Sequence, residues 1–398
     1  MNIKINVLFI VFGFLCLNYA AVNAQFQIGH TTITFNDPDR SGGFGSGGGP
    51  GRQIQTEIYY PADAAGTDVA VANGEFPVIV FGHGFVMAWS AYENIWEELV
   101  PQGYIMAFPR TEGGFTPSHA NFGMDLSLVL DDMLAFNQDN GSIFFERLNG
   151  RSALMGHSMG GGSAMLAAAQ NTNANTVIGL APAETNPSAI DAAEDIAIPA
   201  LVLSGENDGV TPDDEHHIPI YDALDSDCKY FVSILGGAHC YFANSNTNCD
   251  FGELTASSGI SITRAEQQQT SYDAYTPWMD FYLKENATGL SNFENFSEND
   301  SRVQVTSNCP YTLGVNDENH LKTDLILFPN PTNEILTVSI ENAHAQKGVI
   351  LDQLGRTIME FSLANASIEL NVSHLPHGMY FVEIYQDGIK LNKKFIKR

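Results

Sequence analysis

A glycine, a serine and a second glycine alternate with other residues in the run Gly156-His157-Ser158-Met159-Gly160. A short apolar segment, residues 153–155, precedes this run, and small helix-forming residues, 164–170, follow it. The pattern predicts a strand, a tight turn and a helix, with the serine exposed at the turn. A serine held in this way is suited to attack a carbonyl carbon. The alternative is a glycine-rich turn whose serine only caps the helix.

Two further residues suited to this chemistry follow apolar runs later in the chain. Asp208 comes after residues 200–204, and His239 comes after residues 229–235 on a glycine-rich loop. Because parallel strands end at the same edge of a sheet, we expect both side chains to lie near Ser158. The order serine, acid, histidine is that of the α/β-hydrolase fold. The sequence therefore predicts a catalytic triad that needs no cofactor, in which His239 deprotonates Ser158 and Asp208 orients the imidazole.

Two backbone N–H groups are expected to stabilise the oxyanion of the reaction. The apolar run 77–81 leads into Gly82-His83-Gly84-Phe85. In the α/β-hydrolase fold the loop after this strand supplies one donor, and the residue after the nucleophile supplies the other. We therefore assign the oxyanion hole to Phe85 and Met159. His83 is expected to brace its loop.

Substrate contacts are expected from loops at the same edge of the sheet, namely at Phe85, His119, Glu184 and Thr185. His119 has the alternative role of ordering its own loop. Residues 182–199 leave room only for a loop and a short helix, so no large cap is expected over the site. An open site of this kind admits bulky, extended or polymeric substrates.

Two adjacent histidines, His216 and His217, follow an acidic run and raise the question of a metal site. We expect them instead to be exposed residues at the start of a helix, and we expect no metal. The remaining apolar runs predict an α/β fold, a mostly parallel sheet flanked by helices. The expected strands are 28–35, 54–60, 77–81, 104–108, 153–155, 176–181, 200–204 and 229–235, and the longer expected helices are 92–100, 122–137 and 263–283.

Residues 1–24 are typical of a signal peptide. Lys4 supplies the positive start, residues 7–17 the apolar centre, and Val22-Asn23-Ala24 a small-residue cleavage site. The apolar centre is too short to span a bilayer, and no later segment is expected to do so. The mature chain is therefore predicted to begin near Gln25 and to lie outside the cytoplasm.

The charge of the chain is strongly negative, with a net value of −28. Residues 25–316 contain 9 Lys and Arg against 36 Asp and Glu, whereas residues 317–398 contain 8 against 10. This distribution argues against nucleic acid or an anionic membrane as a partner. We expect a monomer.

Four cysteines remain after the predicted signal peptide, and an even number in an exported chain favours two disulfides. Three pairings are possible. Cys240 and Cys249 flank a short polar loop, so we favour this pair, which leaves Cys228 with Cys309. The alternative is four free thiols.

Residues 28–310 resemble the cutinase-like, dienelactone-hydrolase-like and chlorophyllase-like serine esterases, a group that includes the bacterial polyester (PET) hydrolases. The resemblance rests on Gly84-Phe85, on the serine motif with Gly161 and Gly162, on Glu206-Asn207-Asp208 and on Ala238-His239. It implies a secreted carboxylic ester hydrolase that works through an acyl-enzyme. Polyester hydrolases usually carry a tryptophan where this chain reads Ala181-Pro182-Ala183-Glu184-Thr185. This departure argues against their aromatic clamp for terephthalate-type polymers.

The end of the chain has a different composition. After an expected linker, 313–324, short alternating strands include Phe328-Pro329-Asn330-Pro331 and Gly378-Met379-Tyr380-Phe381-Val382, and the chain ends in a basic stretch, 390–398. These features resemble the C-terminal sorting domain of the type IX secretion system of Bacteroidetes, a small β-sandwich. The resemblance implies that the secretion machinery is a partner and that the protein is secreted or lies on the cell surface. A carbohydrate-binding β-sandwich is the alternative.

The expected organisation is therefore a catalytic domain, 25–312, and a sorting domain, 325–398. The catalytic domain has two alternative functions. One is a non-catalytic surface-binding protein with a hydrolase shell, and the other is a serine peptidase on the same fold. An intact triad argues against the first, and the absence of a propeller or peptide-gating domain from the sequence argues against the second.

Overall fold

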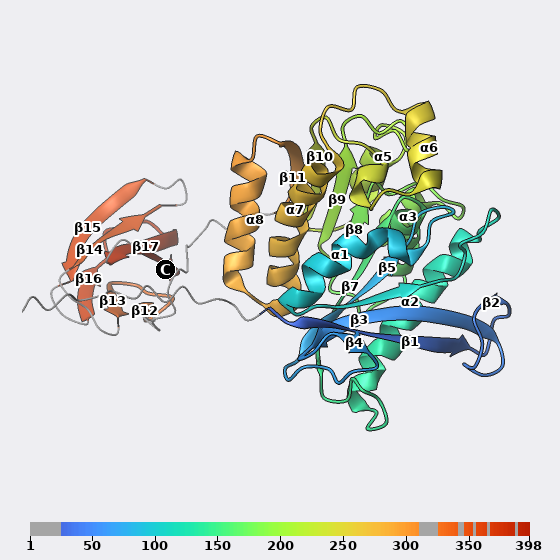
Figure 1. Cartoon of the computed structure of the whole chain (residues 1–398). Coiled ribbons are helices and arrows are strands. Elements are labelled where there is room, and N and C mark those ends of the chain that lie inside the picture. The colour runs from blue at the N-terminus through green and yellow to red at the C-terminus, as the bar shows by residue number, and fades with distance from the viewer. Residues whose placement is uncertain (1–24, 310–324, 341–345, 353–355, 364–366, 387–388) are drawn as a thin grey trace, which may run out of the picture.

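The computed structural model of the chain describes residues 25–309, 325–340, 346–352, 356–363, 367–386 and 389–398 (Figure 1). The predicted signal peptide, 1–24, and the predicted linker, 313–324, lie outside these residues. Among the helices in these ranges, none combines the length and the apolar character needed to cross a bilayer.

An 11-stranded sheet forms the centre of the first part of the chain, in the order β11-β10-β9-β8-β7-β5-β6-β3-β1-β4, with β2 paired to β3. The six strands from β10 to β6 run parallel. Strand β3 pairs antiparallel with β6, β1 with β3, and β11 with β10, whereas the short strands β2 and β4 pair parallel with β3 and β1. The strands are β1 (Gln27–Asp37), β2 (Gly43–Phe44), β3 (Arg52–Ala62), β4 (Gly66–Thr67), β5 (Phe76–Gly82), β6 (Ile105–Pro109), β7 (Leu148–His157), β8 (Thr176–Leu180), β9 (Ala200–Gly205), β10 (Lys229–Ile234) and β11 (Val303–Asn308).

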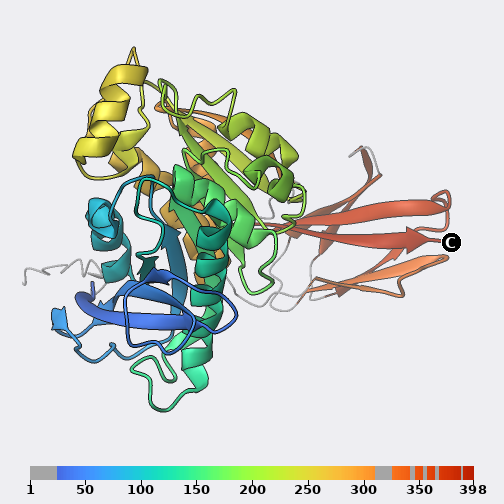
Figure 2. The ribbon, with the colours of Figure 1, turned by 90° about the vertical axis from the view of Figure 1, so that its right-hand side faces the viewer.

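The parallel strands are buried on both faces, which explains their continuous apolar runs. Alternate residues of β5 belong to different cores. Val78 and Val80 pack with α2 and α3, while Ile79 and Phe81 pack with α1, α7 and α8. Helices therefore flank the sheet on both faces (Figure 2). The helices are α1 (Glu93–Leu99), α2 (His119–Ala135), α3 (Met159–Ala168), α4 (Ala189–Ala193), α5 (His217–Ala223), α6 (Thr247–Ala256), α7 (Arg264–Lys284) and α8 (Ala287–Asn299).

Helix α6 differs from the sequence expectation of a short polar loop between Cys240 and Cys249. That interval contains a 3-10 turn, Cys240–Phe242, and the first residues of α6. The helix has a single buried residue, Glu253, so no apolar stripe marks it in the sequence. The side chain of Asn246 caps its N-terminus by accepting from the N–H groups of Asn248 and Cys249.

The C-terminal part of the chain forms two antiparallel sheets with a core of their own. One sheet has the order β12-β13-β16 and the other the order β15-β14-β17-β18. Their shared core includes Leu336, Val338, Ile350, Val382 and Phe395. This arrangement agrees with the small β domain expected from the sequence. The strands are β12 (Leu325–Phe328), β13 (Ile335–Ile340), β14 (Gln346–Leu351), β15 (Thr357–Leu363), β16 (Ser367–Asn371), β17 (Gly378–Gln386) and β18 (Ile389–Lys397).

Candidate active site

Ser158 occupies the sharp turn between β7 and α3. Its backbone has φ 55° and ψ −123°, a conformation that a non-glycine residue adopts only where the surrounding structure enforces it. A Cβ atom on Gly156 would lie 2.2 Å from the Gly160 carbonyl oxygen, and one on Gly160 would lie 2.1 Å from the Gly82 carbonyl oxygen. The turn therefore needs glycine two residues before and two residues after the serine.

Asp208 and His239 lie side by side after the ends of β9 and β10. Asp208 Oδ2 is 2.7 Å from His239 Nδ1, and both side chains are buried. Asp208 Oδ1 accepts hydrogen bonds from the N–H groups of Val210 and Thr211, at 2.9 and 2.8 Å. Burial alone would raise the pKa of Asp208, but the adjacent imidazole and these hydrogen bonds lower it below its ordinary value. An ionised Asp208 holds the proton of neutral His239 on Nδ1 and leaves Nε2 as a base.

His157, the residue before the serine, connects the serine turn to the histidine loop. Its Nε2–H donates to the His239 carbonyl oxygen at 3.0 Å, and the two ring centroids are 4.8 Å apart. Burial lowers the pKa of His157 to about 3, so the ring is neutral and has a single N–H to donate. The turn that holds Ser158 is thereby fixed against the loop that holds His239.

The peptide between Gly84 and Phe85 is held through its carbonyl group. The Gly84 oxygen accepts from the N–H of Met87 at 3.1 Å and lies 2.9 Å from His83 Nδ1, so His83 braces this loop as expected. In a trans peptide the N–H points away from the carbonyl, so the Phe85 N–H faces away from both partners. Met159 is the first residue of α3, where an N–H has no acceptor within the helix. Neither N–H group is therefore held by these neighbouring groups, and the role of both as oxyanion donors stays a prediction.

Three of the predicted substrate residues already have hydrogen-bond partners within the protein. The Glu184 carboxylate accepts two N–H groups at the start of α4, at 3.1 and 3.0 Å. The Thr185 hydroxyl donates to a carbonyl oxygen two residues further on, at 2.6 Å. His119 Nδ1 accepts from the N–H of Asn186 at 3.1 Å, a partner in the loop after β8 and not in its own loop. Contact of these side chains with a substrate stays a prediction.

Aromatic side chains gather at the loops after β5 and β6. Phe85 is 49% exposed and Phe115 81% exposed, and their ring centroids are 6.5 Å apart. A hollow of about 230 Å³ next to the oxyanion loop is lined by Val86, Met87, Trp89 and Arg110, among others. Sequence reasoning found Phe85 but missed the others, because single aromatic residues in loops have no periodicity. Exposed aromatic rings therefore lie on the loops after β5 and β6, whereas the loop after β8 has none at residues 181–185.

Helix α6 is bonded to the residues that follow the predicted acid and base. The N–H of Cys240 donates to Glu253 at 2.6 Å. The N–H of Gly209 donates to the Ser257 hydroxyl at 2.8 Å, and that hydroxyl donates to the second oxygen of Glu253. One buried carboxylate on α6 therefore connects both loops of the site.

Both predicted disulfides are present, Cys240–Cys249 and Cys228–Cys309. The first joins the residue after His239 to α6 and so shortens the free length of the histidine loop. The second joins the residue before β10 to the residue after β11, at the edge of the sheet opposite the site.

The sequence expectation for His217 was wrong. His217 begins α5, as expected, but its side chain is fully buried instead of exposed. Ser204 and Thr211 provide polar partners for its two ring nitrogens, at 2.8 and 3.0 Å, which makes burial of the ring possible. His216 is half-buried and accepts from the N–H of Glu184 at 2.9 Å.

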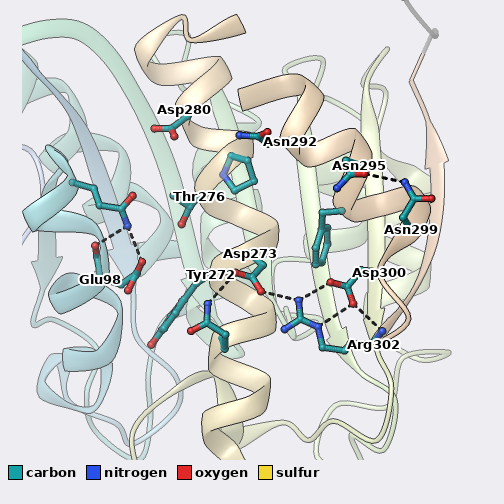
Figure 3. A pocket seen from close by; sticks show the side chains of 14 residues that line it. Glu98, Tyr272, Asp273, Thr276, Asp280, Asn292, Asn295, Asn299, Asp300 and Arg302 are labelled. Atoms are coloured by element: carbon teal, nitrogen blue, oxygen red, sulfur yellow. Dashed lines mark hydrogen bonds and ion pairs between the residues drawn. The ribbon is translucent and has the colours of Figure 1, made fainter. Parts of the chain in front are cut away.

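A separate hollow of about 540 Å³ lies between α1, α7 and α8 (Figure 3). In its lining, Arg302 forms ion pairs with Asp273 of α7 at 2.7 Å and with Asp300 at 2.6 Å. These pairs raise the pKa of Arg302, the hydrogen bond with Asp300 being the largest cause. The hollow contains none of the predicted triad, and its ion pairs connect α7 to the turn before β11.

Comparison with known proteins identifies the family. Residues 20–281 match the family described as PET hydrolase-like, and residues 326–398 match the secretion system C-terminal sorting domain. The chain therefore belongs to the PET hydrolase-like family and is a carboxylic ester hydrolase. Its type IX sorting domain directs it to the cell surface or out of the cell.

Similar curated proteins are hydrolases at modest identity. Cutinase est1 of Thermobifida alba is 26% identical over 226 residues, which cover 56% of this chain and 68% of that protein. Cutinase est2 of the same organism is 27% identical over 226 residues, with 56% and 67% covered. The bis(hydroxyethyl) terephthalate hydrolase of Streptomyces coelicolor is 26% identical over 191 residues, with 48% and 56% covered.

Proposed function

We propose that this protein is a secreted serine carboxylesterase that cleaves esters through an acyl-enzyme formed on Ser158. The observation that carries the proposal is the buried Asp208–His239 pair, 2.7 Å apart and connected through His157 to the strained turn of the serine. In this arrangement Asp208 keeps the proton of His239 on Nδ1, so Nε2 is available to accept the proton of Ser158.

Acylation begins when Ser158 Oγ attacks the ester carbonyl carbon while His239 accepts its proton. The oxyanion of the tetrahedral intermediate receives hydrogen bonds from the N–H groups of Phe85 and Met159, each contributing about 10²–10³ in rate. The bond from the carbonyl carbon to the alcohol oxygen then breaks, and His239 returns the proton to the leaving alcohol. A water molecule, deprotonated by the same imidazole, releases the carboxylic acid and restores Ser158.

The substrate class proposed is that of bulky or extended esters with apolar or aromatic groups. Two features support it. The connection between β8 and β9 contains only the short helix α4, so no large cap covers the site. The exposed rings of Phe85 and Phe115 offer apolar contacts next to the oxyanion loop. The name of the Streptomyces coelicolor relative makes bis(hydroxyethyl) terephthalate a substrate to test.

The test combines turnover with covalent labelling. We expect the protein to hydrolyse p-nitrophenyl esters, and a series from acetate to palmitate, with bis(hydroxyethyl) terephthalate and a polyester film, measures the acyl preference. A fluorophosphonate probe is expected to modify Ser158, as located by peptide mass spectrometry, and to leave the Ser158→Ala variant unmodified. Absence of both ester hydrolysis and labelling would contradict the proposal and favour a binding protein with a hydrolase shell. Faster cleavage of peptide anilides than of esters would favour a peptidase.

A further inference from the structure

A second buried histidine lies behind the predicted acid of the triad. His217 begins α5 and is 0% exposed. Its Nδ1 is 2.8 Å from Ser204 Oγ, at the end of β9, and its Nε2 is 3.0 Å from Thr211 Oγ1. The same Nε2 is 3.8 Å from Asp208 Oδ2, too far for a direct hydrogen bond. The proposed mechanism assigns no role to Ser204, Thr211 or His217.

Thr211 lies at the centre of this cluster. Its hydroxyl oxygen is 3.0 Å from Asp208 Oδ2, 2.9 Å from His239 Nδ1 and 3.0 Å from His217 Nε2. A hydroxyl donates one proton and accepts up to two hydrogen bonds, whereas an ionised carboxylate only accepts. The Thr211 proton must therefore point to Asp208, because any other direction would place two lone pairs face to face. The His217 Nε2–H then donates to the Thr211 oxygen, whereas the His239 Nδ1–H is shared between Asp208 Oδ2 at 2.7 Å and the Thr211 oxygen at 2.9 Å.

This assignment fixes the tautomer of His217. Burial lowers its pKa to about 3, so the ring is neutral and has one N–H. With Nε2 donating to Thr211, Nδ1 is left as the acceptor. It takes the proton of the Ser204 hydroxyl at 2.8 Å, a shorter contact than that of the same hydroxyl with the Gly205 carbonyl oxygen at 3.4 Å. The hydrogen bonds then run in one direction, from Ser204 to His217, to Thr211 and finally to Asp208.

We propose that His217 is a positioning residue of the proposed esterase, which holds the Thr211 hydroxyl proton on Asp208 Oδ2 through its Nε2–H. The inference rests on the proposed roles of Asp208 and His239. Without the imidazole, the Thr211 hydroxyl is free to rotate away from the carboxylate. Asp208 then loses a donor, becomes more basic and stabilises the protonated form of His239. The expected consequence is a smaller fraction of the neutral base at a given pH.

The charged and titratable groups around this cluster are few. Asp208, His239 and His216 face His217, and His157 faces His239. Burial lowers the pKa of His157 to about 3, and the pKa of Asp208 is also lowered, so neither changes charge near neutral pH. His216 is present in every variant below and contributes equally to each profile. A difference between profiles therefore reports the titration of His239.

The test uses two variants that remove different members of the chain of hydrogen bonds. Thr211→Val keeps the shape but removes the hydroxyl, and His217→Leu removes both ring nitrogens. For p-nitrophenyl acetate we expect kcat to fall about tenfold with KM within about twofold. The acid limb of the kcat/KM profile should move about half a unit to higher pH. His217→Gln places an amide N–H near the Nε2 position and is expected to recover kcat to within about threefold of the unchanged protein.

Thr176→Val is the matched control. The Thr176 hydroxyl is also buried and doubly bonded, to the Pro199 carbonyl oxygen and Trp278 Nε1, both at 2.8 Å, but it lies at the start of β8, away from the site. We expect this variant to lower Tm and to leave the pH profile unchanged. A merely structural role for Thr211 would give the same result as Thr176→Val.

A readout without substrate separates this inference from the proposed function. The downfield proton resonance of His239 Nδ1–H reports its titration directly, and its midpoint should rise in Thr211→Val and His217→Leu. An unchanged midpoint and an unchanged kcat in folded Thr211→Val would overturn the inference, even if His217→Leu fails to fold. If the unchanged protein cleaves no ester, the proposed function fails. The His239 Nδ1–H resonance still decides whether His217 acts on the Asp208–His239 pair.

Discussion

The Tyr92 hydroxyl lies 2.9 Å from His157 Nδ1, to which it donates. The same oxygen accepts the Gly84 N–H at 2.8 Å. Tyr92 ends the 3-10 turn Trp89–Tyr92, so a single buried hydroxyl connects the oxyanion loop after β5 to the serine turn after β7. The position of the two predicted oxyanion donors relative to each other depends on this connection.

Tyr92→Phe is therefore expected to reduce both activity and stability. The substitution leaves His157 Nδ1 and the Gly84 N–H, both buried, without the Tyr92 hydroxyl as a partner. This loss is expected to lower the free energy of unfolding by about 1–3 kcal/mol. We expect kcat on a small ester to fall about tenfold because the oxyanion donors lose their fixed geometry. Tyr275→Phe is the matched control, since the buried Tyr275 hydroxyl has no hydrogen-bond partner within the described part of the chain. Equal effects of the two substitutions would contradict this prediction.

Substitutions in the triad should remove nearly all activity without unfolding the protein. Ser158→Ala and His239→Ala are expected to retain less than about 10% of kcat, and Asp208→Asn to lose about 10⁴-fold because the imidazole takes the wrong tautomer. Asp213→Asn, in the same loop as Asp208, is the control. A mild Asp208→Asn together with a severe Asp213→Asn would mean that Asp213 is the acid.

The two disulfides should have different consequences. Removing Cys240–Cys249 by a double serine substitution is expected to lower stability by about 2–3 kcal/mol and to lower kcat as well, because Cys240 follows His239. Removing Cys228–Cys309 should lower stability but leave kcat unchanged, since this bridge lies at the opposite edge of the sheet. Thermal unfolding and kcat of both double variants measure the difference. An unchanged kcat without Cys240–Cys249 would show that the bridge does not position His239.

Acid should destabilise the protein well above the pH at which its carboxylates titrate. Burial lowers the pKa of His157 and His217 from 6.5 to about 3. Between about pH 3 and pH 6.5, both histidines are protonated in the unfolded chain and neutral in the folded chain. The free energy of unfolding therefore falls as the pH falls through this range. Each histidine contributes a slope of about 1.4 kcal/mol per pH unit, and this contribution to stability is complete only above pH 6.5.

The measurement is urea unfolding followed by tryptophan fluorescence, since Trp89, Trp96 and Trp278 all lie before residue 310. His217→Gln should reduce the slope between pH 4 and 6 by about 1.4 kcal/mol per unit. His374→Gln, at an exposed histidine, should leave it unchanged. Identical slopes in His217→Gln and the unchanged protein would mean that His217 is protonated in the folded state.

Removal of the C-terminal domain should not affect the chemistry. The described residues after 325 form a core of their own, and the triad lies before residue 310. We predict that truncation near Thr312 leaves turnover of a small soluble ester unchanged, whereas in the native host the truncated protein accumulates in the periplasm. Loss of turnover on the small ester would mean that the tail belongs to the catalytic domain.

The elements and residues with a strong local pattern could be predicted from the sequence. Buried parallel strands are short apolar runs, and residues after their ends, such as Asp208 and His239, share one edge of the sheet by topology alone. The elbow could be predicted because its glycines are required by close backbone contacts, which leave a mark in the sequence.

The parts that could not be predicted depend on contacts between distant segments. Helix α6 has one buried residue and is held by Asn246, Glu253 and a disulfide, so it has no apolar stripe to indicate it. The burial of His217 depends on Ser204 and Thr211 satisfying its two nitrogens, and no local pattern reports such a match. Tyr92 could not be identified from the sequence for the same reason, since its role depends on hydrogen bonds with His157 and Gly84 that no local pattern indicates.

The antiparallel pairing of β11 decides where a mechanical load on the tail enters the catalytic sheet. Asn308 pairs with Lys229 at the start of β10, and the adjacent Cys309 is bonded to Cys228. A pull on the C-terminal extension, as when the machinery moves it through a membrane, therefore reaches the disulfide before the hydrogen bonds between β11 and β10. The covalent bond transmits the force to β10, inside the sheet. Tension on the tail then does not peel the edge strand away.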